Sequence, residues 1–237
     1  MPPVTQPPRI VISCEHATAR VPARWRADFK TAERALASHR GIDFGAWTLA
    51  KALARKLGVT PHAAKATRLL ADPNRSLDHP RLFSEWTRDA SADEKERMLD
   101  AAWRPHRAAV RAAVEEALAE RGARVVHLSV HSFTPVMDGK VRDVDVGFLY
   151  DPSRERERAL VDRWIAALAE RRPDLRLRRN RPYTGTSDGL IPAFREQFPR
   201  TRYVGVELEV NQRFPLGDRR AWTALRRDLV ASFAELV

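Results

Sequence analysis

Residues 125–135, with the sequence VVHLSVHSFTP, predict the central strand of the fold. The stretch begins as an apolar run behind charged residues, is rich in β-branched valines and ends at a proline. Such a run is typical of a buried strand in a parallel sheet. On an extended strand His127 and His131 lie roughly 13 Å apart, so they cannot bind the same metal ion. Ligands bind at the carboxyl ends of such strands, so we expect His131 to take part in chemistry and His127 to be a core histidine.

Outward from this strand, short apolar runs alternate with longer amphipathic segments. Strands are expected at 9–13, within 59–71, within 141–150, at 175–179 and at 203–210. Helices are expected at 43–57, 92–121, 155–172, 189–198 and 218–236. Pro105 is expected to break the second helix. The alternation predicts an α/β fold with a mixed, mostly parallel sheet flanked by helices. We expect one domain at 9–237 after a disordered, proline-rich tail at 1–8.

The chain has 237 residues and a formal net charge of +11 at pH 7. Only six of its 42 basic residues are lysines, and the arginines are interleaved with Asp and Glu. This pattern favours a solvated, arginine-rich surface over nucleic-acid binding. The single cysteine, Cys14, excludes an internal disulfide framework. Because the sequence shows no signal peptide and no long apolar run, we expect a cytoplasmic protein without a membrane partner.

Polar clusters follow four of the apolar runs. They are Glu15-His16, residues 72–75, His131-Ser132 and residues 207–211. In the last predicted strand Glu207 and Glu209 point to the same face, and a carboxylate in an apolar strand is costly unless it is paired or binds a metal. Glu209 lies nearer the carboxyl end and is the better candidate for a general base or a metal ligand. Glu207, one pleat deeper, is expected to pair with an arginine beneath the site.

These groups by themselves indicate a zinc hydrolase, with two histidines, a carboxylate ligand and a glutamate that activates water. The sequence contains neither a His-Glu-x-x-His segment nor paired cysteines, so the spacing alone is a weak signal. A serine hydrolase built on Ser132 is disfavoured, because the Gly-x-Ser-x-Gly turn is missing. Nucleotide-dependent chemistry lacks a glycine-rich phosphate loop.

Seven segments, taken in order, resemble the N-formylglutamate amidohydrolase family. They are ISCEH at 12–16, SHRGIDFGA at 38–46, RLLADPNRS at 68–76, HLSVHSFTP at 127–135, DVGFLYDP at 145–152, NRPYTGTSDG at 180–189 and VELEVNQ at 206–212. The resemblance runs from about residue 9 to residue 214. It implies an α/β core similar to that of the zinc carboxypeptidases and of the aspartoacylase–succinylglutamate desuccinylase group. In those enzymes two histidines and a glutamate hold the zinc ion.

The resemblance implies that His16 and His131 are metal ligands. In the relatives the carboxylate ligand lies three residues beyond the first histidine, and that position is Ala19 in this sequence. The resemblance favours Asp43 as the substitute, since it lies in a segment similar to the family's acidic motif before a helix. Glu15 is the alternative to Asp43.

The resemblance also suggests how the substrate is bound. Asn74 and Arg75 resemble the Asn-Arg pair with which the relatives hold a substrate carboxylate, and an arginine fork suits that task. We expect Asp72 to orient Arg75 and Arg68 to polarise the scissile carbonyl. Glu209 resembles the catalytic glutamate.

The function implied is hydrolysis of N-formyl-L-glutamate to formate and L-glutamate, with one divalent metal ion, zinc. Ser132 is expected to contact this small substrate. Another N-acyl amino acid or a peptide is the alternative substrate, and an arginine-rich nucleic-acid-binding protein on a hydrolase-like fold is the alternative function. The sequence leaves the oligomeric state open and is compatible with a monomer.

Overall fold

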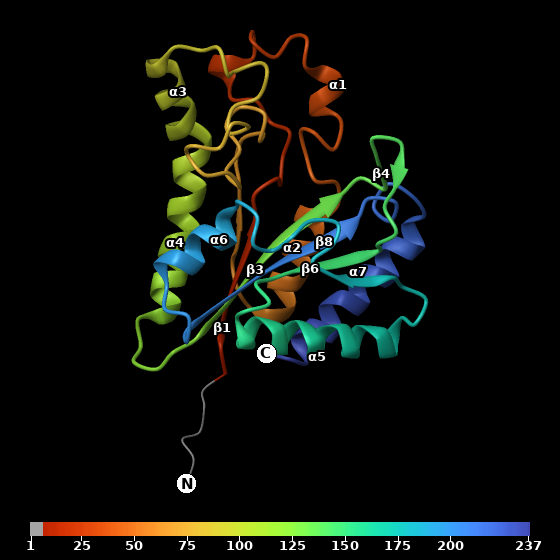
Figure 1. Ribbon diagram of the computed structural model, residues 1–237. Helices are drawn as coiled ribbons and strands as arrows, with labels where there is room; N and C mark the ends of the chain where they lie inside the picture. The colour runs from red at the N-terminus through yellow and green to blue at the C-terminus, as the bar shows by residue number, and fades with distance from the viewer. Residues whose placement is uncertain (1–6) are drawn as a thin grey trace.

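The computed structural model describes residues 7–237, and the chain is built around a six-stranded sheet in the order β2-β1-β3-β8-β6-β7 (Figure 1). The strands are β1 (Arg9–Cys14), β2 (Pro61–Ala63), β3 (Val125–Phe133), β6 (Val146–Leu149), β7 (Leu177–Arg179) and β8 (Tyr203–Asn211). Strands β2, β1, β3 and β8 run parallel, whereas β6 is antiparallel to β8. The predicted mixed, mostly parallel sheet is therefore confirmed. A separate hairpin of β4 (Val136–Met137) and β5 (Lys140–Val141) follows β3.

Helices cover both faces of the sheet (Figure 1). One layer consists of α2 (Ala46–Leu57), α5 (Glu155–Arg171) and α7 (Arg219–Ala234), and the other of α4 (Arg104–Leu118) and α6 (Leu190–Gln197). Two short helices, α1 (Glu33–Leu36) and α3 (Ala92–Met98), and a 3-10 turn at Ala23–Trp25 lie beyond the carboxyl ends of the parallel strands. The strands of the sheet span residues 9–211, and the single domain at 9–237 stays a prediction from the sequence.

The predicted long helix at 92–121 is confirmed as a helical segment, but Pro105 does not break it. Helix α3 continues through a π-helical turn at Leu99–Trp103 directly into α4. The Arg104 N–H donates to the carbonyl of Leu99, five residues back. Pro105 lies directly after this π turn, at the second residue of α4. The irregularity next to Pro105 is therefore a π turn within a continuous helical segment and not a break between two helices.

Other boundaries differ from the prediction by a few residues. The 59–71 stretch forms only the short strand β2, and the 141–150 stretch is divided between β5 and β6. Helix α2 begins at Ala46, because Gly45 adopts a left-handed φ of 81° that α-helical geometry does not allow. Asp43 therefore lies in the turn before the helix. The disordered tail expected at 1–8 falls mainly outside the described residues.

Alternation along β3 and β8 separates the two faces of the sheet. Even-numbered residues such as Val130 and Leu208 join the apolar core with α2, α5 and α7. Odd-numbered residues such as His131 and Glu209, which are paired in the register of the two strands, point to the α4 and α6 side. Both strands are buried along their whole length. The sheet thus collects its polar side chains on one face, at the carboxyl edge.

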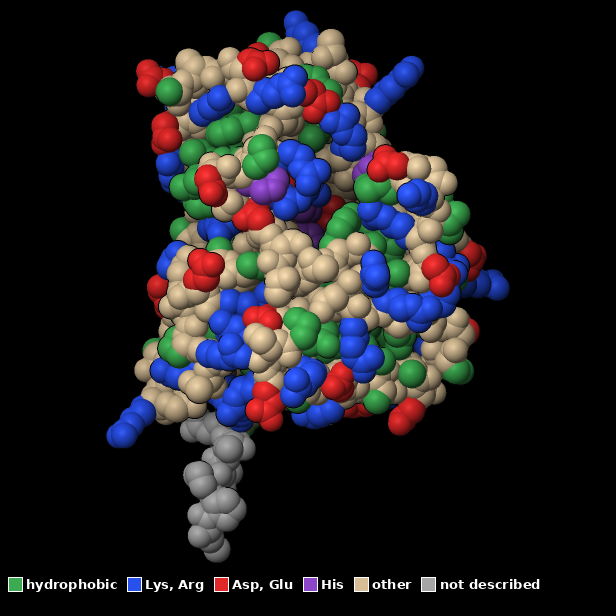
Figure 2. Space-filling view, viewed as in Figure 1, with side chains coloured by type: hydrophobic (Ala, Val, Ile, Leu, Met, Phe, Trp, Pro, Cys, Tyr) green, Lys and Arg blue, Asp and Glu red, His purple; other side chains and the backbone are tan. Residues whose placement is uncertain are grey.

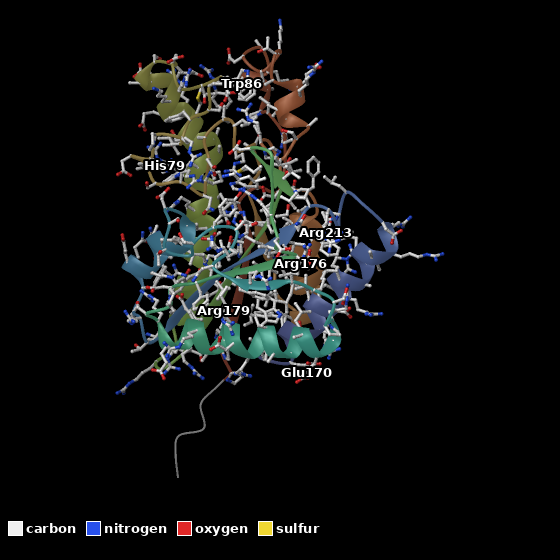
Figure 3. All side chains as sticks on the ribbon, turned by 45° about the vertical axis from the view of Figure 1, so that its right-hand side comes forward. His79, Trp86, Glu170, Arg176, Arg179 and Arg213 are labelled. Atoms are coloured by element: carbon white, nitrogen blue, oxygen red, sulfur yellow. The ribbon has the colours of Figure 1, made fainter. Side chains whose placement is uncertain are left out.

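A second apolar cluster lies above that edge and shapes the space over it. It includes Trp25, Phe29, Leu70, Leu82, Met98 and Leu99. Trp86, which Figure 3 labels near the top of the molecule, stacks on Phe29 with ring centroids 6.2 Å apart. None of the helices in residues 7–237 is long and apolar enough to cross a membrane.

Many arginines are engaged in ion pairs. Arg176 and Arg213, which lie close together beside the sheet, both bind the buried carboxylate of Asp145, at 3.0 and 2.9 Å (Figure 3). These ion pairs fix the two arginines at the edge of the sheet.

Candidate active site

A cavity of about 640 Å³ opens at the carboxyl edge of the sheet, below the second apolar cluster. Figure 2 shows histidine side chains at the bottom of this hollow and basic side chains around it. Every predicted site residue except Glu15 lines it. These residues are His16, Asp43, Arg68, Asp72, Asn74, Arg75, His131, Ser132 and Glu209.

His16, Asp43 and His131 form the centre of the site. His16 follows β1, Asp43 precedes α2 and His131 lies near the end of β3. The Nδ1 atoms of the two imidazoles lie 3.2 and 2.9 Å from the same oxygen, Oδ2 of Asp43. One possible ligand atom from each residue lies within 4.8 Å of the others. The three side chains are buried, so they form a compact group of potential metal ligands.

The far nitrogen of each imidazole contacts a second carboxylate. His16 Nε2 lies 2.8 Å from Asp72 Oδ1, and His131 Nε2 lies 2.9 Å from Glu15 Oε2. A carboxylate can only accept, so each Nε2 carries a hydrogen. In a neutral imidazole with its hydrogen on Nε2, the lone pair of Nδ1 is directed at the centre of the site. Carboxylates commonly orient metal-binding histidines in this way.

Glu15, the alternative to Asp43, lies behind His131. Its Oε1 contacts His106 Nε2 at 3.0 Å, and the Ser129 hydroxyl donates to Oε2, the oxygen that faces His131. Glu15 is fully buried, and it is Asp43 that groups with the two histidines. His106 lies on α4, 91 residues away from Glu15. Sequence reasoning missed it, because no local pattern links a helix histidine to the first strand.

Asp72 does not orient Arg75, as had been expected from the sequence. Its carboxylate accepts two hydrogen bonds from Arg68, at 3.0 and 2.6 Å, as well as the one from His16. Arg68 and Asp72, four residues apart, form an ion pair, whereas no side-chain hydrogen bond or ion pair in residues 7–237 joins Arg75 to Asp72. Arg68 Nη1 also lies 3.0 Å from His16 Nδ1, so its guanidinium borders the centre of the site.

Arg75 is held by Asp188, through the backbone oxygen at 3.2 Å and the carboxylate at 3.8 Å. Asn74 accepts a hydrogen bond from the Leu190 N–H at the start of α6. Trp103, at the end of the π turn, donates to the backbone oxygen of Arg75. The loop is thus fixed from two helices, and both side chains remain at the wall of the cavity.

Ser132 is engaged with protein groups, although it borders the cavity. Its hydroxyl donates to the carbonyl of Phe44 at 2.8 Å and accepts from Gln212 at 3.1 Å. Its N–H contacts Asp43 Oδ2 at 3.2 Å. These contacts support the turn that carries Asp43, and within residues 7–237 no histidine is hydrogen-bonded to the hydroxyl as a serine nucleophile would require.

A sequence model of a known family matches most of the chain. The N-formylglutamate amidohydrolase model covers residues 9–215. The chain belongs to this family. It is therefore a hydrolase of amide bonds. The family resemblance that the seven sequence segments indicate is confirmed.

Two solved structures share the fold over nearly the whole chain. A gene product from Agrobacterium tumefaciens is 26% identical, with a TM-score of 0.79 over 96% of this chain and 91% of that chain. An N-formylglutamate amidohydrolase from Ralstonia eutropha JMP134 is 21% identical, with a TM-score of 0.70 over 98% of this chain and 94% of that chain. No curated protein matches the sequence.

Glu209 stands beside the histidine centre of this amidohydrolase. It lies opposite His131 in the register and is 5% exposed, and its Oε2 has no hydrogen-bond partner among the described residues. Burial raises the pKa of Glu209 to about 8. A buried carboxyl oxygen without a partner, facing a cavity, is suited to exchange a proton with a ligand or a water molecule.

The buried carboxylates and imidazoles of the centre shift one another's pKa values. Although burial alone would raise their pKa values, the neighbouring histidines hold the pKa of Asp43 and that of Glu15 below the usual range. Burial would lower the pKa of His131, but its hydrogen bonds to Asp43 and Glu15 raise it well above the ordinary value. Oδ2 of Asp43 lies near both Nδ1 atoms, and Arg68 adds positive charge 3.8 Å from Oδ1. The remaining negative charge can be matched by a proton on an imidazole or by a metal ion.

Proposed function

We propose that this amidohydrolase hydrolyses N-formyl-L-glutamate to formate and L-glutamate, with one zinc ion held by His16, Asp43 and His131. The observation that carries the proposal is the convergence of two imidazole Nδ1 atoms on Asp43 Oδ2, next to the unpaired carboxyl of Glu209. Family membership supports the reaction class.

The residues present fit a catalytic zinc site. Three protein ligands, two imidazoles and one carboxylate, are typical of such sites and leave a position for water or substrate. Both imidazoles are already oriented by carboxylates through Nε2. Asp72 and Glu15 would therefore act as positioning residues for His16 and His131.

A zinc ion in this position would lower the pKa of a bound water toward about 7 and polarise the acyl oxygen. Glu209 would accept a proton from the attacking water at its unpaired Oε2 and return it to the leaving amine. A nearby cation favours the ionised form of Glu209, which is the form a base requires.

Arg68 and the 74–75 loop would bind the substrate on either side of this centre. Arg68, fixed by Asp72, directs its Nη1 at the centre and would stabilise charge that develops on the acyl oxygen. In residues 7–237 Arg75 Nε and Nη2 make no hydrogen bond, so they are available to bind the α-carboxylate together with Asn74.

The proposal is tested by metal analysis and a substrate panel. We expect about one zinc ion per chain, loss of hydrolysis after chelation and recovery on adding zinc. Among N-formyl, N-acetyl and N-succinyl derivatives of L-glutamate and L-aspartate, N-formyl-L-glutamate should give the highest kcat/KM. The panel includes larger acyl groups because a cavity of about 640 Å³ is in the range of sites for drug-sized ligands.

Full activity without metal would overturn the metal assignment, and a higher kcat/KM for another acyl group would overturn the substrate. An inactive, metal-free protein that binds generic DNA with a steep salt dependence would favour the nucleic-acid alternative. The cytoplasmic location and the monomeric state stay predictions from the sequence.

A further inference from the structure

Glu207 is a buried carboxyl that the mechanism leaves unused. It is 8% exposed and borders the cavity. The arginine partner expected from the sequence is not present: no hydrogen bond or ion pair joins the Glu207 side chain to any other group in residues 7–237. Arg195, whose charge acts on it from the same side of the sheet, is bonded to Glu157 and to the carbonyls of Gly185 and Gly205. Because it borders the cavity, this carboxyl can be satisfied only by what enters the cavity, either water or a ligand.

Its position along β8 separates Glu207 from the histidine centre. Glu207 is paired in register with Ser129, whereas Glu209 is paired with His131. The two carboxyls share one face and are displaced by about 6–7 Å along the strand. Glu209 thus stands at the histidines, and Glu207 stands deeper in the same cavity.

Gly189 shows what lies beside Glu207. A Cβ atom on this glycine would come within 3.4 Å of Glu207 Oε1 and within 3.1 Å of Asn74 Oδ1. The Glu207 carboxyl and the Asn74 amide therefore flank the same point, just before α6. A side chain at 189 would intrude between them. Glu207 belongs to the Asn74 end of the cavity, away from the acyl side.

We propose that Glu207 binds the side chain of the leaving amino acid and selects a side chain that ends in a carboxyl group. The inference rests on the proposed function, in which Asn74 and Arg75 hold the α-carboxylate and the scissile amide lies at Glu209. The side chain of the same amino acid then starts between these two points and lies against Glu207.

The chemistry of Glu207 favours a carboxylate partner. Burial raises the pKa of Glu207, which favours its neutral form. A neutral carboxyl donates its O–H to a substrate carboxylate, and this charge-assisted bond is short and strong. A carboxamide is a weaker acceptor. An apolar side chain would leave Glu207 buried and unpaired, which is the costliest arrangement.

The test compares three substrates that differ only at the end of the side chain: N-formyl-L-glutamate, N-formyl-L-glutamine and N-formyl-L-norvaline. The zinc-loaded variants are Glu207→Gln and Glu207→Leu, with Glu196→Gln on the exposed side of α6 as the matched control. We expect Glu207→Leu to lose about tenfold or more in kcat/KM for the glutamate derivative, chiefly through KM, and to lose little for norvaline. Glu207→Gln, which keeps a donor, should restore most of the preference for glutamate.

Three outcomes would overturn the inference. They are an equal loss of kcat/KM on all three substrates in Glu207→Leu, a folded and zinc-loaded Glu207→Gln that is inactive on every substrate, and a wild type that prefers glutamine. Calorimetric binding of the products L-glutamate, L-glutamine and L-norvaline tests Glu207 without turnover. If the wild type hydrolyses no N-formyl derivative but binds L-glutamate in a Glu207-dependent way, the proposed reaction fails and the inference stands. If L-glutamate binds no better than L-norvaline, the inference fails.

Discussion

Two histidines of the central strand, four residues apart, show how differently one strand can use the same side chain. His127 is 0% exposed and His131 is 2% exposed, so burial does not distinguish them. The ring of His127 contacts two hydroxyls, Ser13 Oγ at 2.9 Å and Tyr203 Oη at 2.8 Å. The ring of His131 contacts two carboxylates, those of Asp43 and Glu15.

The partners give the two rings opposite properties. Burial lowers the pKa of His127 to about 3, whereas the two carboxylates raise the pKa of His131 well above its ordinary value. Hydroxyls can donate or accept, so they satisfy a neutral ring completely. Carboxylates only accept, so their surroundings need positive charge. A buried histidine therefore indicates a functional site when its hydrogen-bond partners are carboxylates, whose negative charge must be balanced. Burial alone does not indicate a functional site.

The largest effect should separate the two histidines by metal binding. Replacement of one of three ligands leaves an incomplete shell, so we expect His131→Ala to lose most of its zinc and nearly all of its activity. His127→Gln, the matched control on the same strand, should keep one zinc ion per chain. Metal analysis and turnover of both variants check this. Equal zinc content in the two proteins would remove His131 from the metal site.

A smaller loss is expected for Glu209→Gln. The amide has nearly the same shape but cannot take a proton, and loss of a general base typically costs about 10²–10⁴-fold in rate. Since Glu209 is not proposed as a ligand, the variant should fold and keep its zinc. The measurement is kcat on N-formyl-L-glutamate, together with zinc content and melting temperature. Turnover within a few-fold of the wild type would show that another group activates the water.

Glu15→Gln probes the carboxylate behind His131. A glutamine keeps one acceptor but loses the charge that orients His131, so zinc affinity should fall about 10–100-fold, as for other positioning residues. With saturating zinc, kcat should recover toward the wild-type value. Competition with a chelator of known affinity measures the change. If Glu15→Gln binds no zinc at any concentration while Asp43→Asn binds it normally, then Glu15 is the ligand and Asp43 is not.

Sequence patterns predicted those parts of the molecule that depend on neighbours along the chain. The apolar runs predicted the strands. The polar residues at the ends of these runs indicated His16, His131 and Glu209 as candidate site residues. These residues meet because parallel strands bring their carboxyl ends to one edge. The core role of His127 followed in the same way from its place in the middle of a strand, and its two satisfied nitrogens confirm it.

The partners of these residues could not be predicted, because they depend on side-chain directions across long separations. The sequence predicts Asp72 as a partner of Arg75, yet its carboxylate contacts Arg68 and His16. Arg75 is held instead by Asp188, 113 residues later. The expected pairing of Glu207 with an arginine failed for a similar reason, since Arg195 is used elsewhere in the fold. A sequence pattern indicates which side chains lie at the carboxyl edge of the sheet. Which of them form ion pairs with one another depends on how the side chains pack in the folded protein.

The smallest effect concerns His127 and the pH dependence of stability. The folded state keeps the His127 ring neutral down to a pKa of about 3, whereas the unfolded state binds a proton at about 6.5. The unfolded state therefore binds more protons below pH 6.5, and the free energy of unfolding falls as the pH decreases. For this group alone the loss in the free energy of unfolding between pH 7 and pH 5 is about 2 kcal/mol.

Glutamine does not titrate, so His127→Gln should be less stable at pH 7 but should lose about 2 kcal/mol less than the wild type between the two pH values. Urea unfolding at pH 7 and pH 5 measures this, with the half-buried His79→Gln as control. An identical pH dependence in His127→Gln and the wild type would show that the ring is not held neutral, and the contrast with His131 would then disappear.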